Sequence, residues 1–480
     1  MGNYSEENTE LLPVHPRPGA RPARAIWIGE DGAGPVEETN PDVRPFSQSS
    51  AVQFSEVVQA YQGRHSARAT SVGSQKSAIK TRPKQSRLLG VDVARGIAFL
   101  GMVVIHILPI SDESTGEPTP IWTIFSGNAA ALFALLAGIS LAFMTGGSRP
   151  YTGDKRMRAL VSITARSALL MVIGMSINMV GDASGVFNIL PYYGLMFLIA
   201  IPLTMMPVRW LLIAAIGFAA IGPFLVYPAY ERLGDGYTGN PTLVELVQRP
   251  QDVFNVLVFT GAYPVVTWAL YVCVGIAIGR LSLHRERTQL ALVFVGGIVA
   301  VFSKITAYIL LMRQGGIEAI FNATDGLTQE EFSDLRIFGP SDYFPTTTYW
   351  WLTVDAPHSN TPFAMTFSLG IAMLALGLIL LLSKYLMSWL AVFSNMGSMT
   401  LTLYSAHLVS VNLVNINHEP MMWFLITIFV AAAFAMLWAN VFGNGPLERV
   451  VSRISKAVGR AVIPDSRSRK NGTRSRHAAK

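Results

Sequence analysis

The sequence predicts an all-α, polytopic integral membrane protein with about ten transmembrane helices and disordered cytoplasmic N- and C-terminal tails. The 480 residues are 51% hydrophobic and only 14% charged, with a mean hydropathy of +0.39, whereas soluble proteins carry about 25% charged residues. Apolar stretches long enough to cross a bilayer recur along the chain. Much of the basic excess behind the net charge of +7 lies in the two tails. We therefore expect the lipid bilayer as a partner, with the tails facing its anionic cytoplasmic leaflet, and no nucleic acid.

Composition divides the chain into three regions. Residues 1–86 are rich in Ser, Pro, Gly, Glu and Arg without apolar periodicity, which is typical of a disordered tail. Residues 87–443 form the predicted transmembrane domain. Residues 444–480 form a basic cytoplasmic tail that begins with a predicted amphipathic helix over 446–463. The single cysteine, Cys273, lies in an apolar stretch and excludes an intrachain disulfide.

The charges of the connections between apolar stretches alternate and thereby predict the topology. Short basic connections, such as GRLSLHRER and SKYL, alternate with acidic or neutral ones, such as SDESTGEPTP and the 230–263 and 313–361 loops. Because Lys and Arg near span ends stay cytoplasmic, we expect a multi-pass protein of the plasma (inner) membrane with both termini inside. The predicted spans are 88–110, 121–143, 159–180, 187–206, 209–229, 264–280, 289–312, 363–383, 389–413 and 420–442.

Three ionisable residues lie in the first predicted span, LLGVDVARGIAFLGMVVIHILPI: Asp92, Arg95 and His106. Ionisable groups at membrane depth are costly unless they pair or face a cavity, so they mark function by default. Asp92 precedes Arg95 by about one helical turn and can pair with it. The eleven steps from Arg95 to His106 place both on nearly the same helix face, ~16 Å apart. The alternative is a structural Asp–Arg pair with a hydrogen-bonded core histidine.

Arg166, Lys304 and His407 are further ionisable residues within predicted spans. Arg166 can snorkel to the inner surface, whereas Lys304 lies well past the middle of its helix. A hydrogen-bonded interior lysine and a functional lysine both remain open for Lys304. His407 lies in SMTLTLYSAHLVSVNL among hydroxyl residues at helical spacing. That pattern indicates either contacts between helices or a functional site.

The 313–361 loop contains TYWWLTVDAPHSNT, in which aromatic and polar residues are combined. Its tryptophans, Trp350 and Trp351, are typical of anchors at the membrane interface, although aromatic faces also suit sugars or acyl chains. The interface interpretation does not explain Asp355 and His358, which stand three residues apart just before a span.

The segment RLLGVDVARGIAFLGMVVIH resembles the opening of transmembrane acyltransferases. It is similar to the heparan-alpha-glucosaminide N-acetyltransferase family, whose Asp-x-x-Arg-Gly start is matched by Asp92, Arg95 and Gly96. It is also similar to the related acyltransferase-three family, in which Arg is followed by ten residues and His, as Arg95 is by His106. The resemblance covers about residues 87–455 and includes the blocks ALFALLAGISLAF, GAYPVVTWALYVCVGIAIGRLSL, APHSNTP, GSMTLTLYSAHL and NGPLERVV.

The chain departs from the first of these families at the expected catalytic histidine. That family typically carries Asn where this chain has His106, and its catalytic His lies in the loop after the first span. Here that loop, SDESTGEPTP, has no histidine. We therefore assign the role to His106.

The resemblance implies a membrane acyltransferase that moves an acyl group, expected to be acetyl, from cytoplasmic acyl-CoA (acetyl-CoA). The acceptor is expected to be a hydroxyl or amine of a cell-envelope glycan or glycolipid. His106 is the expected base, Asp92 holds Arg95, and Arg95 and Arg166 bind the phosphate-bearing part of CoA. No metal is predicted, and a homodimer is left open. The alternative function is a secondary transporter or flippase of an envelope precursor, while a scaffolding protein would leave the charged helix unexplained. The expected substrate-binding residues are His358, Asp355 and His407.

Overall fold

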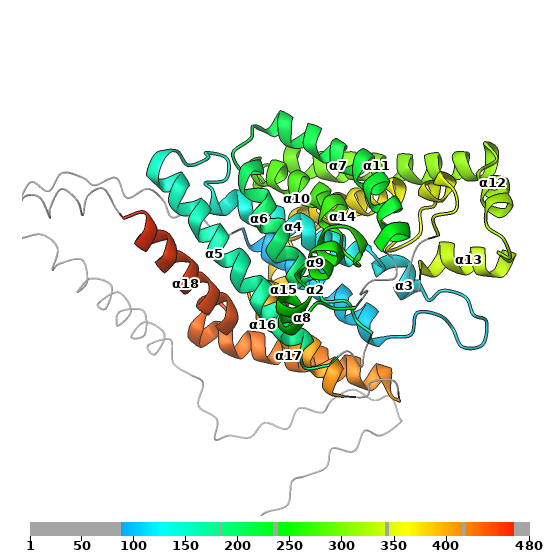
Figure 1. Ribbon diagram of the computed structural model, residues 1–480. Helices are drawn as coiled ribbons and strands as arrows, with labels where there is room; N and C mark the ends of the chain where they lie inside the picture. The colour runs from blue at the N-terminus through cyan, green and yellow to red at the C-terminus, as the bar shows by residue number, and fades with distance from the viewer. Residues whose placement is uncertain (1–87, 182–184, 234–238, 341–344, 415–417, 465–480) are drawn as a thin grey trace, which may run out of the picture. The chain divides into compact units, whose positions relative to one another are not determined.

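The computed structural model describes residues 88–181, 185–233, 239–340, 345–414 and 418–464. The tail predicted for residues 1–86 and the end of the basic tail after residue 464 lie outside them. Across the described ranges the structure is helical, with no β-strand and only one isolated bridge, between Ser111 and Pro118. The all-α class is therefore confirmed for this part of the chain (Figure 1).

Seven described segments are helical, long and apolar enough to cross a membrane, and a further pair bent by 57° raises the number to eight if it forms one span. This confirms a membrane protein by length and composition. The seven are α2 (Leu89–Ile107), α3 (Pro120–Phe125) with α4 (Asn128–Met144), α5 (Gly153–Asn178), α7 (Val208–Leu233), α11 (Glu286–Arg313), α14 (Pro362–Leu382) and α17 (Pro420–Phe442). The bent pair joins α9 (Pro250–Asn255) and η1 (Val256–Thr260) to α10 (Val265–Gly279).

The predicted count of about ten spans is not confirmed, because two predicted spans form shorter helices. Residues 187–206 contain α6 (Leu190–Leu203), which has 14 residues, and residues 389–413 are divided between α15 (Met387–Gly397) and α16 (Thr400–Leu413). A helix enclosed by protein does not need the full length that lipid contact demands. The remaining helices are α8 (Leu243–Gln248), α12 (Gly316–Ala323), α13 (Gln329–Phe338), η2 (Tyr349–Thr353) and α18 (Pro446–Val462).

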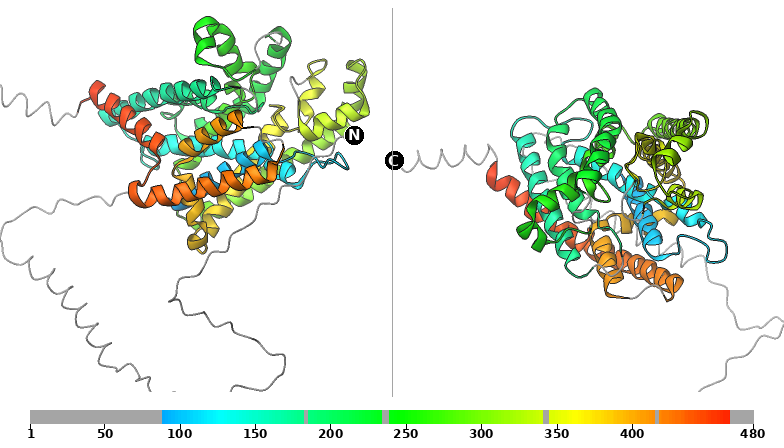
Figure 2. Two further views of the ribbon diagram at one scale, coloured as in Figure 1. Left: turned by 90° about the horizontal axis from the view of Figure 1, so that it is seen from below. Right: turned by 45° about the vertical axis from the view of Figure 1, so that its right-hand side comes forward.

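Helix α2 is the most enclosed candidate span, with 72% of its apolar window buried, whereas α17 has only 11%. Both views of Figure 2 place α17, in orange, at the periphery of the helices. Glycines allow α15 to approach α2 closely. A Cβ added at Gly397 would lie 1.7 Å from the backbone oxygen of Asp92, and one at Gly96 would lie 2.1 Å from that of Phe393. The ionisable residues of α2 therefore sit among helices, where small residues permit backbone contact.

Helix α18 confirms the amphipathic helix predicted at the start of the basic tail. It packs on α5, and Figure 1 shows it in red beside that helix. Glu448 in its first turn accepts hydrogen bonds from the backbone N–H groups of Leu401 (2.7 Å) and Thr402 (3.2 Å) at the start of α16. The expectation of a disordered C-terminal tail is not confirmed for residues 446–462, which form this helix. Val451, Ser455 and Gly459 are buried on one side of it, whereas the apolar side chains of Val450, Ile454 and Val458 are exposed.

Three interruptions of helical structure lie near one another. Gly127, with φ of 70°, separates α3 from α4; residues 261–264 separate η1 from α10, and residues 354–361 separate η2 from α14. Non-helical backbone at membrane depth is tolerated where it is buried in protein or lines a cavity. All three interruptions contribute to the walls of the cavities described next.

Candidate functional site

The predicted Asp92–Arg95 pair is present at the start of α2. Arg95 Nη1 lies 2.8 Å from Asp92 Oδ1, and Arg95 Nη2 donates to Ser140 Oγ of α4 at 2.7 Å. Asp92 is only 4% exposed, so its carboxylate balances the guanidinium charge inside the bundle. The two hydrogen bonds, made by different nitrogens, fix the orientation of the planar guanidinium group.

Arg95 and Arg166 meet in one cavity of about 340 Å³, which we call the cationic cavity. Arg166 enters from α5, and within the described part of the chain its side chain makes no recorded hydrogen bond or ion pair; its buried Nε is unpartnered. Glu448 also lines the cavity, but its carboxylate already accepts from the start of α16. Because Asp92 balances Arg95, Arg166 is the guanidinium group of this cavity that remains available to an anionic group such as phosphate.

His106 and His407, 301 residues apart, form a hydrogen-bonded pair. His106 Nδ1 lies 3.0 Å from His407 Nε2. The ring planes differ by 8° and the ring centroids are 5.2 Å apart, which matches two coplanar imidazoles joined edge to edge. Because Nδ1 of His106 is engaged, its Nε2 is the nitrogen left for other chemistry. Tyr404 of α16 lies beside the pair, its ring centroid 6.5 Å from that of His106.

A second cavity of about 640 Å³, the central cavity, is lined by both His106 and His358. Met102 lines the central cavity and the cationic cavity. Helix α2 therefore supplies Arg95 to one cavity, Met102 to both and His106 to the other. This order agrees with the predicted placement of Arg95 and His106 along one helix.

The loop that carries His358 is held in a strained conformation. His358 and Asn360 have φ of 57° and 54°, a left-handed region that non-glycine residues rarely adopt and that is enriched near functional sites. Thr361 Oγ1 donates to the Val354 carbonyl at 2.6 Å, and Trp268 Nε1 donates to Asn360 Oδ1 at 2.8 Å. Desolvation by the surrounding protein lowers the pKa of His358 to about 4, so this imidazole is neutral near pH 7.

Lys304 is not a lone interior lysine, because its Nζ lies 2.6 Å from Asp355 Oδ2. The ion pair joins α11 to the loop before α14. Both residues line a third cavity of about 240 Å³, which we call the Lys304 cavity. It shares His358, Asn360, Trp122 and Gly127 with the central cavity.

The structure divides the three residues expected to bind substrate. His358 and Asp355 line the Lys304 cavity, whereas His407 contacts His106 and lines an apolar cavity of about 350 Å³ beside α17. Glu448, Met102 and Arg336 line cavities at this site, although the sequence analysis did not select them. The block NGPLERVV already contained Glu448, but nothing in the sequence around Met102 or Arg336 indicates that these residues line a cavity.

Comparison with known proteins supports the family resemblance. Residues 87–314 match the family model described as heparan-alpha-glucosaminide N-acetyltransferase, catalytic. A search of the curated proteins found no match. The matched stretch contains the Asp92–Arg95 pair, His106 and Arg166, whereas His358 and His407 lie beyond it. The resemblance to the heparan-alpha-glucosaminide N-acetyltransferase family is thus confirmed over residues 87–314.

Proposed function

We propose that this membrane protein transfers an acetyl group from cytoplasmic acetyl-CoA to a hydroxyl or amine of a cell-envelope glycan or glycolipid. One observation carries the proposal: Met102 lines both the cationic cavity and the histidine-lined central cavity, and Arg95 and His106 lie on either side of it on the same helix. A donor with an anionic end and a reactive thioester end fits this sequence of cavities. The plasma membrane, with both termini in the cytoplasm, is the proposed location, because the basic connections favour it.

Arg95 and Arg166 are the proposed donor-binding residues. Guanidinium groups suit phosphate because their planar donors match its oxygens. Asp92 is a positioning residue, since its bond to Arg95 fixes that guanidinium group. Arg166 has no recorded hydrogen bond to give up within the described residues, so it can turn towards an incoming phosphate.

His106 is the proposed general base. Its Nε2 takes the proton from the acceptor hydroxyl or amine as the acceptor attacks the thioester carbon. The carbon–sulfur bond then breaks, the CoA thiolate leaves, and His106 returns the proton to it. The products are the acetylated acceptor and free CoA. For Nε2 to be the base, Nδ1 must carry a proton and donate it to His407 Nε2.

The experiment that tests donor binding is calorimetry of acetyl-CoA with the full chain in lipid nanodiscs. We expect Arg166→Gln to weaken binding about ten- to a hundredfold, the usual effect of losing a charge-assisted contact. Arg209→Gln, an exposed residue at the start of α7, is the matched control and should bind normally. Unchanged binding in Arg166→Gln, or no binding of acetyl-CoA to the wild type, would contradict the proposal.

The interrupted helices give the transporter alternative one specific support, because secondary transporters often bind substrate where helices are broken. Transfer of radioactive acetyl from acetyl-CoA to an envelope glycolipid extract distinguishes the two functions. Label should appear in the lipid fraction only with the wild type. Uptake of an envelope precursor into proteoliposomes without such transfer would favour transport.

A further inference from the structure

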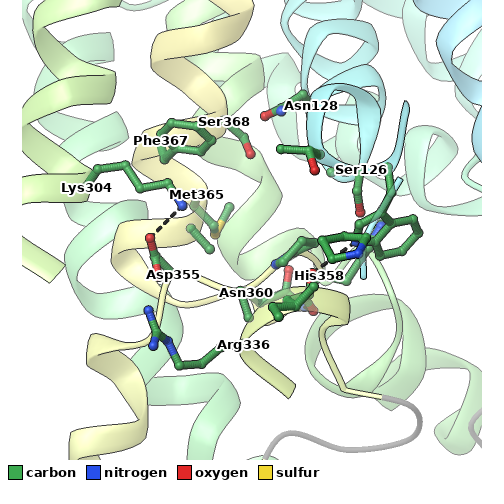
Figure 3. Close-up of a pocket in the computed structure, with 18 of the residues that line it drawn as sticks. Ser126, Asn128, Lys304, Arg336, Asp355, His358, Asn360, Met365, Phe367 and Ser368 are labelled. Carbon is green, nitrogen blue, oxygen red and sulfur yellow. Dashed lines mark hydrogen bonds and ion pairs between the residues drawn. The ribbon is translucent and has the colours of Figure 1, made fainter. Parts of the chain in front are cut away.

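The Lys304 cavity has the composition of a ligand site, and it contains neither Arg95 nor His106, the residues proposed for donor binding and proton transfer. Figure 3 shows Lys304 and Arg336 on one side of it, with Ser126 and Asn128 across the opening. The wall is formed at the break between α3 and α4, by α11, and by the loop before α14. Arg336 and Asp355 lie beyond residues 87–314, whereas Ser126, Asn128 and Lys304 lie within them.

Among the residues that the structure describes, three polar atoms in the wall are buried without a hydrogen-bond partner: Ser126 Oγ, Asn128 Oδ1 and Arg336 Nε. Ser126 is 6% exposed and Asn128 is 9% exposed. Asn128 is oriented by its own amide, since Nδ2 donates to the Ile124 carbonyl at 2.9 Å and leaves Oδ1 free. Buried polar groups in native proteins are nearly always satisfied. Three unsatisfied groups around one cavity therefore indicate a polar occupant that contacts them.

The charges of the cavity favour an anion. Asp355 is already paired with Lys304 at 2.6 Å. Arg336 makes no recorded hydrogen bond or ion pair within the described ranges, and its guanidinium carbon lies 5.8 Å from the Phe332 ring centroid. His358 is neutral near pH 7 because desolvation lowers its pKa to about 4. One cation therefore remains unbalanced at the wall.

Aromatic rings provide flat apolar surfaces in the same cavity. Trp122 and Trp268 line it, and both indoles are fixed by hydrogen bonds from Nε1, to the Ile337 carbonyl at 3.0 Å and to Asn360 Oδ1 at 2.8 Å. Fixed rings, a few oriented polar groups and one cation are the mixture expected of a small-molecule site. Apolar ring faces pack against the C–H faces of a sugar, and the polar groups bind its hydroxyls.

We propose that the Lys304 cavity binds an anionic sugar, one that carries a carboxylate or phosphate, with Arg336 contacting the anion and Ser126 and Asn128 contacting hydroxyls. The proposal rests on the proposed function, in which this sugar belongs to the acceptor. His358 and Asn360 lie between this cavity and the central cavity. A sugar bound here therefore places a neighbouring hydroxyl or amine of the acceptor towards His106.

The test measures binding of small probes to the full chain in nanodiscs by saturation-transfer NMR, without acetyl-CoA. The probes are glucuronate, glucose 6-phosphate, glucose and inorganic phosphate. We expect one or both anionic sugars to bind at least about tenfold more tightly than glucose and than inorganic phosphate. Arg336→Gln should lower the affinity for the anionic sugar about ten- to a hundredfold, and Arg336→Lys should lower it less. Lys384→Gln, which breaks an ion pair with Glu286 elsewhere, is the matched control.

Each outcome decides the proposal. Preference for glucuronate or for glucose 6-phosphate supports it and identifies the anion. Equal binding of glucose, equal binding of inorganic phosphate, unchanged affinity in Arg336→Gln, or no saturable binding of any probe overturns it. Acetyl-CoA binding is measured on the same samples. Normal acetyl-CoA binding without sugar binding rejects only this sugar site. Sugar binding without acetyl-CoA binding rejects acetyl-CoA as the donor.

Discussion

The hydrogen bond between His106 and His407 allows the two histidines to be assigned different roles. The perturbation is His407→Phe, which keeps a flat ring in the buried site but removes the nitrogen that lies 3.0 Å from His106 Nδ1. If His106 is the base, His407 acts only by holding the tautomer that leaves Nε2 of His106 free for the acceptor. The substitution should then slow acetyl transfer without changing acetyl-CoA affinity, because neither histidine lines the cationic cavity.

The expected magnitudes are well separated. Losing one neutral hydrogen bond costs about 0.5–1.5 kcal/mol, or about two- to twelvefold in rate. Losing a general base typically costs about 10²–10⁴-fold, which is the expected effect of His106→Ala. Because His407 acts through His106, the double variant should be no slower than His106→Ala by more than about twofold.

The assay is the initial rate of radioactive acetyl transfer from acetyl-CoA to an envelope glycolipid extract, with protein in nanodiscs. Phe434→Leu, at another residue of the apolar cavity beside His407, serves as the control for packing changes. A loss in His407→Phe as large as that in His106→Ala would refute the reasoning and move the base to His407. Near wild-type turnover in His106→Ala would refute it as well.

Three further predictions concern packing, pH and topology. Gly397→Ala should lower the melting temperature and abolish transfer, because its Cβ would lie 1.7 Å from the backbone of α2. Gly217→Ala is the control and should change neither, because a Cβ there meets nothing within 4 Å. Equal melting temperatures of the two variants would contradict this. Folding favours the neutral form of His358, whose pKa is about 4 in the folded protein against 6.5 when unfolded. Protonation therefore favours unfolding, and the free energy of unfolding of the wild type should fall relative to that of His358→Gln as the pH drops from about 6.5 to 4. A difference between the two free energies that does not change with pH would contradict this. In a cysteine-free background, an impermeant thiol reagent added to intact cells should label Asp325→Cys, exposed between α12 and α13, and label His284→Cys only after permeabilisation; the opposite pattern would invert the predicted topology.

Local rules determined several features of this protein from the sequence alone. The Asp92–Arg95 pair follows from the i,i+3 spacing on a helix, and the structure contains it at 2.8 Å. The amphipathic pattern over 446–463 likewise predicted α18. Apolar length and low charge predicted a helical membrane protein, because a bilayer imposes both requirements on every span. The motif around Asp92 and Arg95 also indicated the family whose model matches residues 87–314.

Other features depended on contacts between distant segments, which only the tertiary structure decided. Nothing local to α2 or α16 indicates that His106 and His407 meet, since 301 residues separate them. Lys304 gains Asp355 from a loop 51 residues later, and Ser126 and Asn128 line the same cavity as residues of α11 and of the 354–361 loop. The predicted count of about ten spans is not confirmed, because the length rule describes a helix that crosses lipid, whereas α6 has only 14 residues, nine of them buried.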